Sequence, residues 1–119
     1  MTKDTIVLYG IPNCDTVKKA RTWLQTNGIE FRFHDFRKDG LDKADVKQWL
    51  DALGLDTVLN KKGTTWRKLP EDVRNGVVDA KTALPLLVEQ PSLIKRPVLV
   101  AGKTLRCGFK ADDYAEIFA

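Results

Sequence analysis

The chain begins with an apolar run that gives way to a helical spacing of apolar residues. Thr5–Tyr9 is β-branched and apolar and is closed by Gly10, which predicts a strand buried on both faces. In the segment that follows, the apolar positions fall three and four residues apart: Val17, Ala20, Leu24. This spacing predicts a helix with one buried face, and Asn27-Gly28 predicts its end.

Glu30–Phe36 alternates in polarity, with Phe31 and Phe33 on one side and Arg32 and His34 on the other. Alternation with a period of two predicts a half-buried strand, and we expect it near the edge of its sheet. The N-terminal part of the chain therefore contains a strand, a helix and a second strand. Such a unit implies two parallel strands joined by a right-handed crossover.

The middle of the chain is helical in pattern. Asp42 is a suitable N-cap for a helix that Gly54 ends. The apolar positions of this helix follow the spacing i, i+3, i+4, i+7: Val46, Trp49, Leu50, Leu53. We expect one more short turn over residues 55–59, a polar loop over Lys61–Lys68 and a short helix that opens at Pro70.

Ala80–Gln90 is also helical in composition, and Pro91 ends it. Pro85 fits this segment if the regular helix begins near Thr82, because proline is tolerated in the first turn of a helix.

The β pattern returns near the C-terminus. Pro97–Val100 and Thr104–Cys107 are apolar segments joined by a short Gly-containing turn, which predicts a hairpin. A final helix opens at Asp112 and carries its apolar residues on one side: Tyr114, Ile117, Phe118. The order is thus β-α-β, a helical insertion at about 41–91, and β-β-α. We expect a single α/β domain over residues 1–119 with a four-stranded mixed sheet.

Composition places the chain among ordinary globular proteins. Apolar residues make up 43% and charged residues 30% of the 119 residues, which argues against disorder and against rod-like folds. Two cysteines and one histidine are too few for a closed four-ligand zinc site, and we expect no metal. No apolar run approaches the length of a membrane span or of a signal peptide, so we expect a cytoplasmic protein that does not associate with membranes.

The net charge of +4 permits acidic partners but does not demand them. The densest basic groups are Lys18-Lys19-Arg21, Lys61-Lys62 and Arg67-Lys68. No stripe of interleaved aromatic residues accompanies them, so we interpret each as a solvated face and expect no nucleic-acid partner.

Cys14 is the strongest candidate for chemistry. It lies between the predicted buried strand and the predicted helix, where unpaired backbone N–H groups and the helix dipole favour thiolate over thiol. Asp15 opposes this effect, because a neighbouring carboxylate repels the thiolate. The alternative is that Cys14 is a small buried residue of this loop. Thr16 either donates a hydroxyl hydrogen bond to the thiolate or only helps to start the helix.

Other residues constrain what Cys14 can do. Val17 stands where a dithiol motif would place its second cysteine, so Cys14 acts as a monothiol or finds a distant partner. If the strand of Cys107 runs parallel to the first strand, Cys107 lies at the same sheet edge as Cys14. That placement leaves open that Cys107 resolves a disulfide formed at Cys14. The alternative is that Cys107 is a buried residue of its strand. We expect His34, the only imidazole, to be exposed rather than paired with Cys14. Arg96 faces either an anion or Cys14, or is a surface arginine.

Three segments together resemble the ArsC family of thioredoxin-fold proteins, and in particular its YffB branch. They are Tyr9–Ala20 (YGIPNCDTVKKA), Gly63–Leu69 (GTTWRKL) and Ile94–Leu99 (IKRPVL), and the resemblance covers essentially the whole chain. It implies a thioredoxin-like sheet with an α-helical insertion, Cys14 as the reactive cysteine, and Arg96 before a cis Pro97 beside it. Spx regulators and glutaredoxin-dependent arsenate reductases are related to the same family.

The chain departs from the arsenate-reductase pattern of three arginines around the cysteine. Arg96 matches one of them, whereas Asn60 and Gly108 stand at the other two, and Gly10 replaces the family's histidine. A charge-assisted hydrogen bond from an arginine to a bound anion is typically worth about 1.5–3 kcal/mol. We expect Arg67, in the predicted loop, as a substitute anion ligand. For the Spx comparison, Val17 removes the Cys-x-x-Cys switch that many of these regulators carry.

The resemblance therefore implies a glutathione-dependent thiol oxidoreductase in which Cys14 forms a mixed disulfide. The residues expected to bind substrate are Thr16, Arg67, Arg96 and Pro97. Glutathione is expected as a co-substrate, with no bound cofactor, and a glutaredoxin or a disulfide-containing protein is expected as a partner of a monomeric chain. The alternatives are a glutaredoxin-dependent arsenate reductase and an Spx-like regulator that docks another protein.

Overall fold

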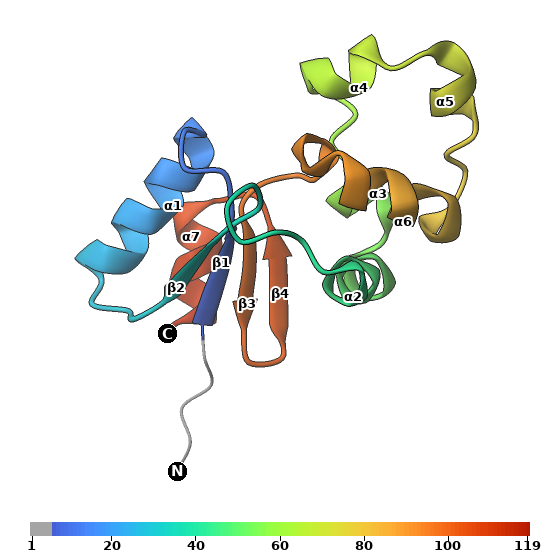
Figure 1. Ribbon diagram of the computed structural model, residues 1–119. Helices are drawn as coiled ribbons and strands as arrows, with labels where there is room; N and C mark the ends of the chain where they lie inside the picture. Colours follow the sequence, from blue (N-terminus) through green and yellow to red (C-terminus); the bar gives the residue numbers. More distant parts are fainter. Residues whose placement is uncertain (1–5) are drawn as a thin grey trace. The chain divides into compact units, whose positions relative to one another are not determined.

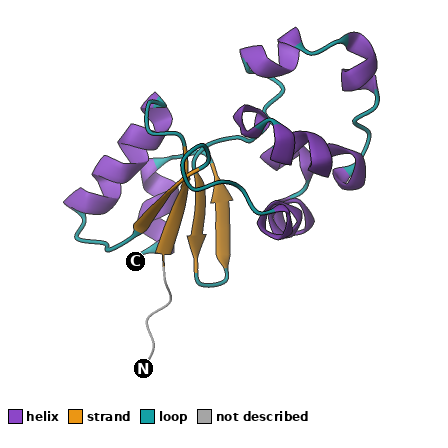
Figure 2. Ribbon diagram, in the orientation of Figure 1, coloured by secondary structure: helices purple, strands orange, loops and turns teal. Residues whose placement is uncertain are grey.

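The computed structural model describes residues 6–119, which form two compact units. The first, named the sheet unit, contains the described chain up to Gly40 together with Arg96–Ala119. The second, named the helical unit, is Leu41–Lys95. All the strands of the described chain belong to the sheet unit (Figure 2). Among the described residues, no helix has both the length and the apolar character needed to span a bilayer.

The sheet has four strands in the order β2-β1-β3-β4 (Figure 1). They are β1 (Ile6–Gly10), β2 (Arg32–Asp35), β3 (Val98–Ala101) and β4 (Thr104–Cys107). β1 and β2 are parallel, whereas β3 is antiparallel to both β1 and β4. The predicted four-stranded mixed sheet of thioredoxin-like topology is confirmed, and so is the edge position of β2. The predicted first residue of the first strand, Thr5, lies outside the described residues.

Two helices cover one face of this sheet (Figure 1). They are α1 (Asp15–Thr26) and α7 (Ala111–Ile117). Leu8 and Leu99 are opposite each other in the β1–β3 ladder, so their side chains point to the same face. Both are fully buried, and they pack with three buried residues of the two helices: Ala20, Leu24, Tyr114. This apolar cluster fixes both helices on the sheet.

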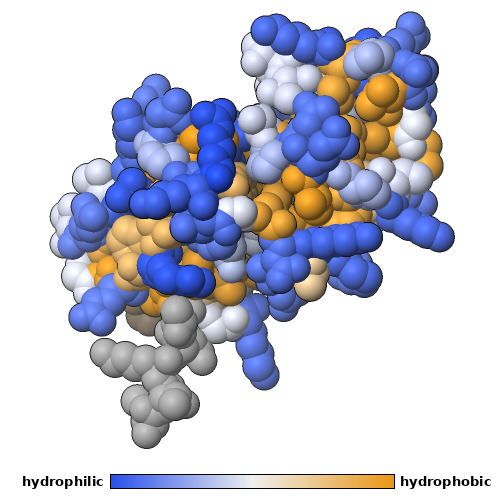
Figure 3. Space-filling model, in the orientation of Figure 1, coloured by the Kyte–Doolittle hydropathy of each residue, from blue (hydrophilic) through white to orange (hydrophobic). Residues whose placement is uncertain are grey.

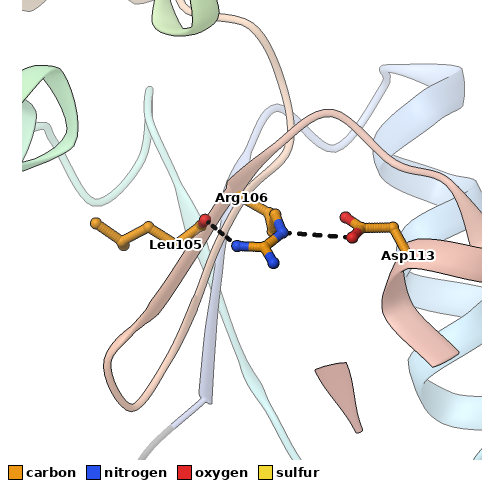
Figure 4. A network of polar contacts seen from close by, with 3 residues as sticks. All are labelled: Leu105, Arg106 and Asp113. Atoms are coloured by element: carbon orange, nitrogen blue, oxygen red, sulfur yellow. Dashed lines mark hydrogen bonds and ion pairs between the residues drawn. The ribbon is translucent and has the colours of Figure 1, made fainter. Parts of the chain in front are cut away.

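Polar contacts tie the edge strand to the last helix. Arg106 of β4 donates from its Nε to the carboxylate of Asp113 at 3.3 Å and from a terminal nitrogen to the carbonyl of Leu105 at 3.0 Å (Figure 4). Arg106 is the ladder partner of Leu99, which explains why it reaches the face that α7 covers. Because both charged groups of the pair are well exposed, the pair orients α7 more than it stabilises the fold.

The helical unit contains five short helices and one 3₁₀ turn. They are α2 (Lys43–Leu53), α3 (Leu55–Val58), α4 (Thr64–Lys68), α5 (Glu71–Asn75), α6 (Ala80–Glu89) and η1 (Pro91–Leu93). Helices α2 and α6 pack together, and the apolar face predicted for α2 is buried at Val46, Trp49 and Leu50. Leu87 of α6 is also fully buried. The unit is closed near its end by a bridge between Leu59 and Ile94 and by a 2.7 Å hydrogen bond from Lys95 N–H to Val58 C=O.

Two details of the helical unit differ from the prediction. The predicted loop over Lys61–Lys68 is wrong in its second half, where α4 forms. Helix α6 begins at Ala80 rather than near Thr82, because Asp79 and Thr82 form a capping box around its first turn. Pro85 consequently lies beyond the first turn, where it removes one intrahelical hydrogen bond.

All the described residues that are buried are apolar, and none of them is charged. Figure 3 shows hydrophilic side chains over much of the surface, with apolar residues visible between them. Among the residues that the structure describes, Val78, before α6, is the large apolar residue with the greatest exposure, at 73%.

The end of β1 packs tightly on α1. A methyl group on Gly10 would lie only 2.8 Å from a methyl carbon of Val17, which is itself fully buried. Gly10 is therefore needed for close approach of the strand to the helix that carries Cys14 at its start.

We expect Gly10→Ala to lower the free energy of unfolding by about 1–3 kcal/mol through overpacking. Val17→Ala is expected to cost about 2 kcal/mol through the cavity it leaves. Because Val17→Ala also removes the clash, the double variant should lose less than the two changes together, by about 1 kcal/mol. Urea unfolding of the four proteins measures this, and strict additivity would show that the two residues do not press on each other.

Candidate active site

The chain turns sharply between β1 and α1, and Cys14 is at the end of that turn. The Cys14 N–H donates to the Ile11 carbonyl at 3.2 Å, and the Cys14 carbonyl accepts from Lys18 N–H at 2.9 Å. Cys14 is thus the N-cap residue of α1, with an extended backbone conformation. Its sulfur lies where the first N–H groups of the helix have no carbonyl partner.

This position changes the ionisation of the thiol. Burial on its own raises the pKa of Cys14, because a partly desolvated thiolate is disfavoured. Hydrogen bonds from the Val17 N–H and the Arg96 guanidinium, the positive charge of Arg96 and the Thr16 N–H outweigh burial, so that the pKa of Cys14 is lowered overall. These donors favour the thiolate, which accepts hydrogen bonds more strongly than the neutral thiol.

Arg96 reaches Cys14 because of the register between β1 and β3. Tyr9 is opposite Val98, so the loop after β1 and the residues before β3 leave the sheet at the same edge. The Arg96–Pro97 peptide bond is cis. Arg96 is half-buried and Pro97 is buried, and the Pro97 carbonyl accepts a 2.8 Å hydrogen bond from Gly108 N–H.

The predicted site residues thus fall into two groups. The sheet unit brings together Cys14, Thr16, Arg96 and Pro97. Thr16 lowers the pKa of Cys14 through its backbone N–H. This bond does not decide whether the Thr16 hydroxyl binds the thiolate or only helps to start the helix. Arg67 is exposed on α4 of the helical unit, and the groups that shift the pKa of Cys14 all come from the sheet unit. The Val17 N–H was missed as a contributor, although its place in the first turn of the helix was a signal for it.

Cys107 lies at the same sheet edge as the Cys14 loop. β4 is antiparallel to β3 and β3 to β1, so β4 runs in the direction of β1, and Cys107 is its last residue. Both cysteines of the chain are described, both are half-buried, and neither is in a disulfide. β4 therefore has the parallel direction to β1 that a role for Cys107 requires.

His34 has a structural position. Its ring lies 4.7 Å from the ring of Tyr9, its ladder partner, and its Nε2 is 2.7 Å from the Gly40 carbonyl. This ring nitrogen binds the loop that leaves β2, and His34 is not among the groups that shift the pKa of Cys14. Among residues 6–119, no group of histidine, cysteine and carboxylate side chains could hold a metal ion.

The two positions that lack an arginine have local roles. The Asn60 side-chain oxygen accepts from Lys62 N–H at 3.2 Å, and its nitrogen lies 3.0 Å from the point where Gly63 would carry a Cβ. Gly108 has φ +82°, a left-handed conformation that side chains disfavour. Asn60 therefore shapes its own loop, and an arginine at position 108 would meet a backbone cost.

The family follows from a comparison of the whole chain. Residues 9–117 match the sequence model of the ArsC family. The chain belongs to the ArsC family. Among solved structures, the YffB protein is 47% identical to this ArsC-family chain, with a TM-score of 0.92 over 97% of this chain and 100% of the other. The match spans the loop of Cys14 and the start of β3.

Other proteins similar to this chain carry different functional names. An uncharacterized protein of Haemophilus influenzae is 46% identical over 114 residues, covering 96% of this chain and 99% of the relative. An arsenate reductase (ArsC) related protein from Brucella melitensis is 47% identical, with a TM-score of 0.76 over 99% and 98% of the two chains. The global transcriptional regulator Spx 1 of Lactococcus lactis is 30% identical over 110 residues, covering 91% of this chain and 84% of the regulator.

Replacement of Arg96 by alanine should raise the pKa of Cys14, because it removes both a hydrogen bond to the thiolate and a positive charge. Each unit of that rise corresponds to about 1.4 kcal/mol of lost stabilisation of the thiolate relative to the thiol. Ultraviolet absorbance of the thiolate, titrated in a Cys107→Ser background, measures the change. Arg106→Ala is the matched control, since that guanidinium pairs with Asp113. Equal titration curves for the two variants would show that Arg96 does not stabilise the thiolate.

Gly108→Ala should lower the free energy of unfolding by about 1–2 kcal/mol, the cost of a left-handed backbone for a residue with a Cβ. Gly76→Ala is the control, because Gly76 has φ −75° and its added Cβ would meet nothing closer than 3.5 Å. That control should be neutral or stabilising, by up to about 1 kcal/mol. Urea unfolding distinguishes the two, and equal effects would contradict the assigned backbone constraint.

Proposed function

We propose that this ArsC-family chain is a glutathione-dependent thiol oxidoreductase with Cys14 as its nucleophile. The observation that carries the proposal is the lowered pKa of Cys14, which depends on the N–H groups of Val17 and Thr16 and on the Arg96 guanidinium. A lower pKa gives more thiolate at neutral pH, and the thiolate is the species that attacks disulfides. The position of Cys14 as N-cap of α1 leaves its sulfur outside the helix, where a second sulfur can approach.

The reaction proceeds by two exchanges of disulfide bonds. The Cys14 thiolate attacks the glutathione sulfur of a mixed disulfide, forms a Cys14–glutathione disulfide and expels the other half of the substrate as a thiolate, which takes a proton from solvent. A second glutathione thiolate then attacks the glutathione sulfur bound to Cys14. Oxidised glutathione leaves and the Cys14 thiolate is regenerated. The net exchange converts the mixed disulfide and one glutathione into the free substrate thiol and oxidised glutathione, so the sulfur of the incoming glutathione is oxidised as the sulfur of the substrate is reduced.

The neighbouring residues have distinct parts in this proposal. Arg96 stabilises the thiolate and offers a cation to the carboxylates of glutathione. The backbone at Pro97, just before β3, lies beside an extended glutathione, and Thr16 contributes its N–H to the sulfur. Arg67 is proposed as a further anion ligand. No bound cofactor takes part, glutathione or a glutaredoxin acts as the reductant, and the reducing cytoplasm is the proposed location.

Cys107 is not needed for this cycle. The monothiol route uses only Cys14, while the location of Cys107 at the same sheet edge makes an alternative dithiol route testable. In that route a Cys14–Cys107 disulfide would form in place of a lasting glutathione adduct.

Two other functions are represented among the relatives. Arsenate reduction has the weaker support, because Asn60 and Gly108 replace two of the three arginines that its site uses and each has a local structural role. A regulatory role is favoured by the 30% identity with Spx 1 of Lactococcus lactis, whereas Val17 removes the Cys-x-x-Cys switch. A pull-down with RNA polymerase would reveal a regulator of that kind.

Treatment with oxidised glutathione should add one glutathione to Cys14, and intact-protein mass spectrometry measures the adduct. The Cys107→Ser variant should form it as completely as the unchanged protein, because the monothiol route needs only Cys14. The Cys14→Ser variant, which keeps Cys107, is the matched control and should form little adduct.

A monomer that instead loses two hydrogens and carries no glutathione would show a Cys14–Cys107 disulfide and establish the dithiol route. Reaction at Cys107 alone would contradict the choice of nucleophile.

A further inference from the structure

A groove of about 460 Å³ runs beside α1 in the sheet unit. Its apolar part is formed by Trp23 of α1, by Phe109 just before α7 and by Ala111, the first residue of α7. Its sides are formed by exposed residues of α1 and by Asn27, which follows that helix. The rings of Trp23 and Phe109 are held edge-on against Tyr114, at 5.6 and 4.7 Å between centroids. The groove therefore has a rigid aromatic floor, the kind of anchor on which protein interfaces depend.

One end of the groove lies about one helical turn from the proposed nucleophile. Lys18, at one end of it, bonds through its N–H to the carbonyl of Cys14. Thr26 and Asn27 are at the other end. Because a helix rises about 1.5 Å per residue, Thr26 lies about 18 Å along the helix from Cys14. Glutathione is a tripeptide that spans at most about 10 Å, so it cannot reach from Cys14 to the far end of the groove.

The charged residues that line the groove are all positive. Lys18 and Lys19 line its end near Cys14, and the remaining polar lining residues, Thr22, Thr26 and Asn27, are neutral. In the part of the chain that the structure describes, the ion pairs are Lys47–Asp51 and Arg106–Asp113, so neither lysine is in an ion pair. An occupant with carboxylates near its reacting sulfur complements this arrangement.

We propose that this groove docks the protein half of the disulfide substrate, as a segment that carries acidic residues near its cysteine and an apolar side chain farther along. The proposal rests on the function proposed above and names its substrate class as a glutathionylated protein. The acidic residues meet Lys18 and Lys19, and the apolar side chain contacts Trp23 and Phe109. Attack by the Cys14 thiolate on the glutathione sulfur then expels the protein thiolate, which is protonated by solvent, and a second glutathione regenerates Cys14 as oxidised glutathione leaves.

The test compares two glutathionylated peptides in the Cys107→Ser protein. One has glutamates beside its cysteine and a leucine farther along, and the other has lysines in place of the glutamates. We expect the acidic peptide to be reduced about tenfold faster, because its charge complements that of the groove. The mixed disulfide of glutathione and free cysteine serves as the small substrate that cannot occupy the groove.

Thr26→Glu places a carboxylate in the groove far from Cys14, and Gln25→Glu places the same group on the next residue of α1, which does not line the groove. Both positions are exposed and both lie in the last turn of the helix, so the two changes are matched in their effect on folding. Thr26→Glu should slow reduction of the acidic peptide about tenfold, and Gln25→Glu should stay within about twofold of the parent protein. Reduction of the small substrate should be the same in all three proteins.

Binding is measured separately from chemistry with the acidic peptide in which serine replaces cysteine. It should shift the NMR signals of the Trp23 indole and of the Thr22 and Thr26 amides. Shifts there without turnover of any disulfide would support the groove and overturn the oxidoreductase. Turnover of the small substrate, with no shifts and with equal rates for both peptides and both variants, would overturn the groove and leave the oxidoreductase standing. Absence of both shifts and turnover would overturn both.

Discussion

The antiparallel pairing of β3 with β1 is the constraint on which the candidate site depends. Val98 is opposite Tyr9, so the loop that carries Cys14 and the residues that precede β3 meet at one edge of the sheet. Leu8 and Leu99 fix this pairing, because they are buried together against α1 and α7. A shift of one residue would turn these side chains to the other face and would move Arg96 along the edge. The thiolate and its guanidinium therefore depend on apolar packing elsewhere in the sheet unit.

The parts of the fold that sequence reasoning predicted are those with a strong local pattern. The spacing of Val17, Ala20 and Leu24 specified α1 and its buried face, and the alternation around Phe33 specified an edge strand. The pattern also placed Cys14 between a strand and the N-terminus of a helix, because that inference needs only the two neighbouring elements. The contribution of Arg96 came from the family resemblance, since the β1–β3 register joins segments far apart in the sequence.

The features that were not predicted depend on hydrogen bonds or backbone angles that a pattern of polarity does not contain. The helix α4 is a single short turn in a polar segment, and such a turn has no apolar period to reveal it. The start of α6 is set by the reciprocal bonds of Asp79 and Thr82, which place Pro85 deeper in the helix than its sequence preference indicates. At Gly108 the sequence showed a missing arginine, whereas the structure shows a left-handed residue whose N–H binds the Pro97 carbonyl. An absent charge and a required backbone conformation are indistinguishable at the level of sequence.

The chain passes from the helical unit to the sheet unit between Lys95 and Arg96. Lys95 is held to the body of the helical unit by its bond to the Val58 carbonyl, and the side chain of the next residue stabilises the thiolate of Cys14. A binding event or a local opening that breaks the Lys95 bond would loosen the backbone from which the Arg96 guanidinium extends. The residue whose guanidinium lowers the pKa of Cys14 is therefore joined by a single peptide bond to a residue that the inserted helices hold.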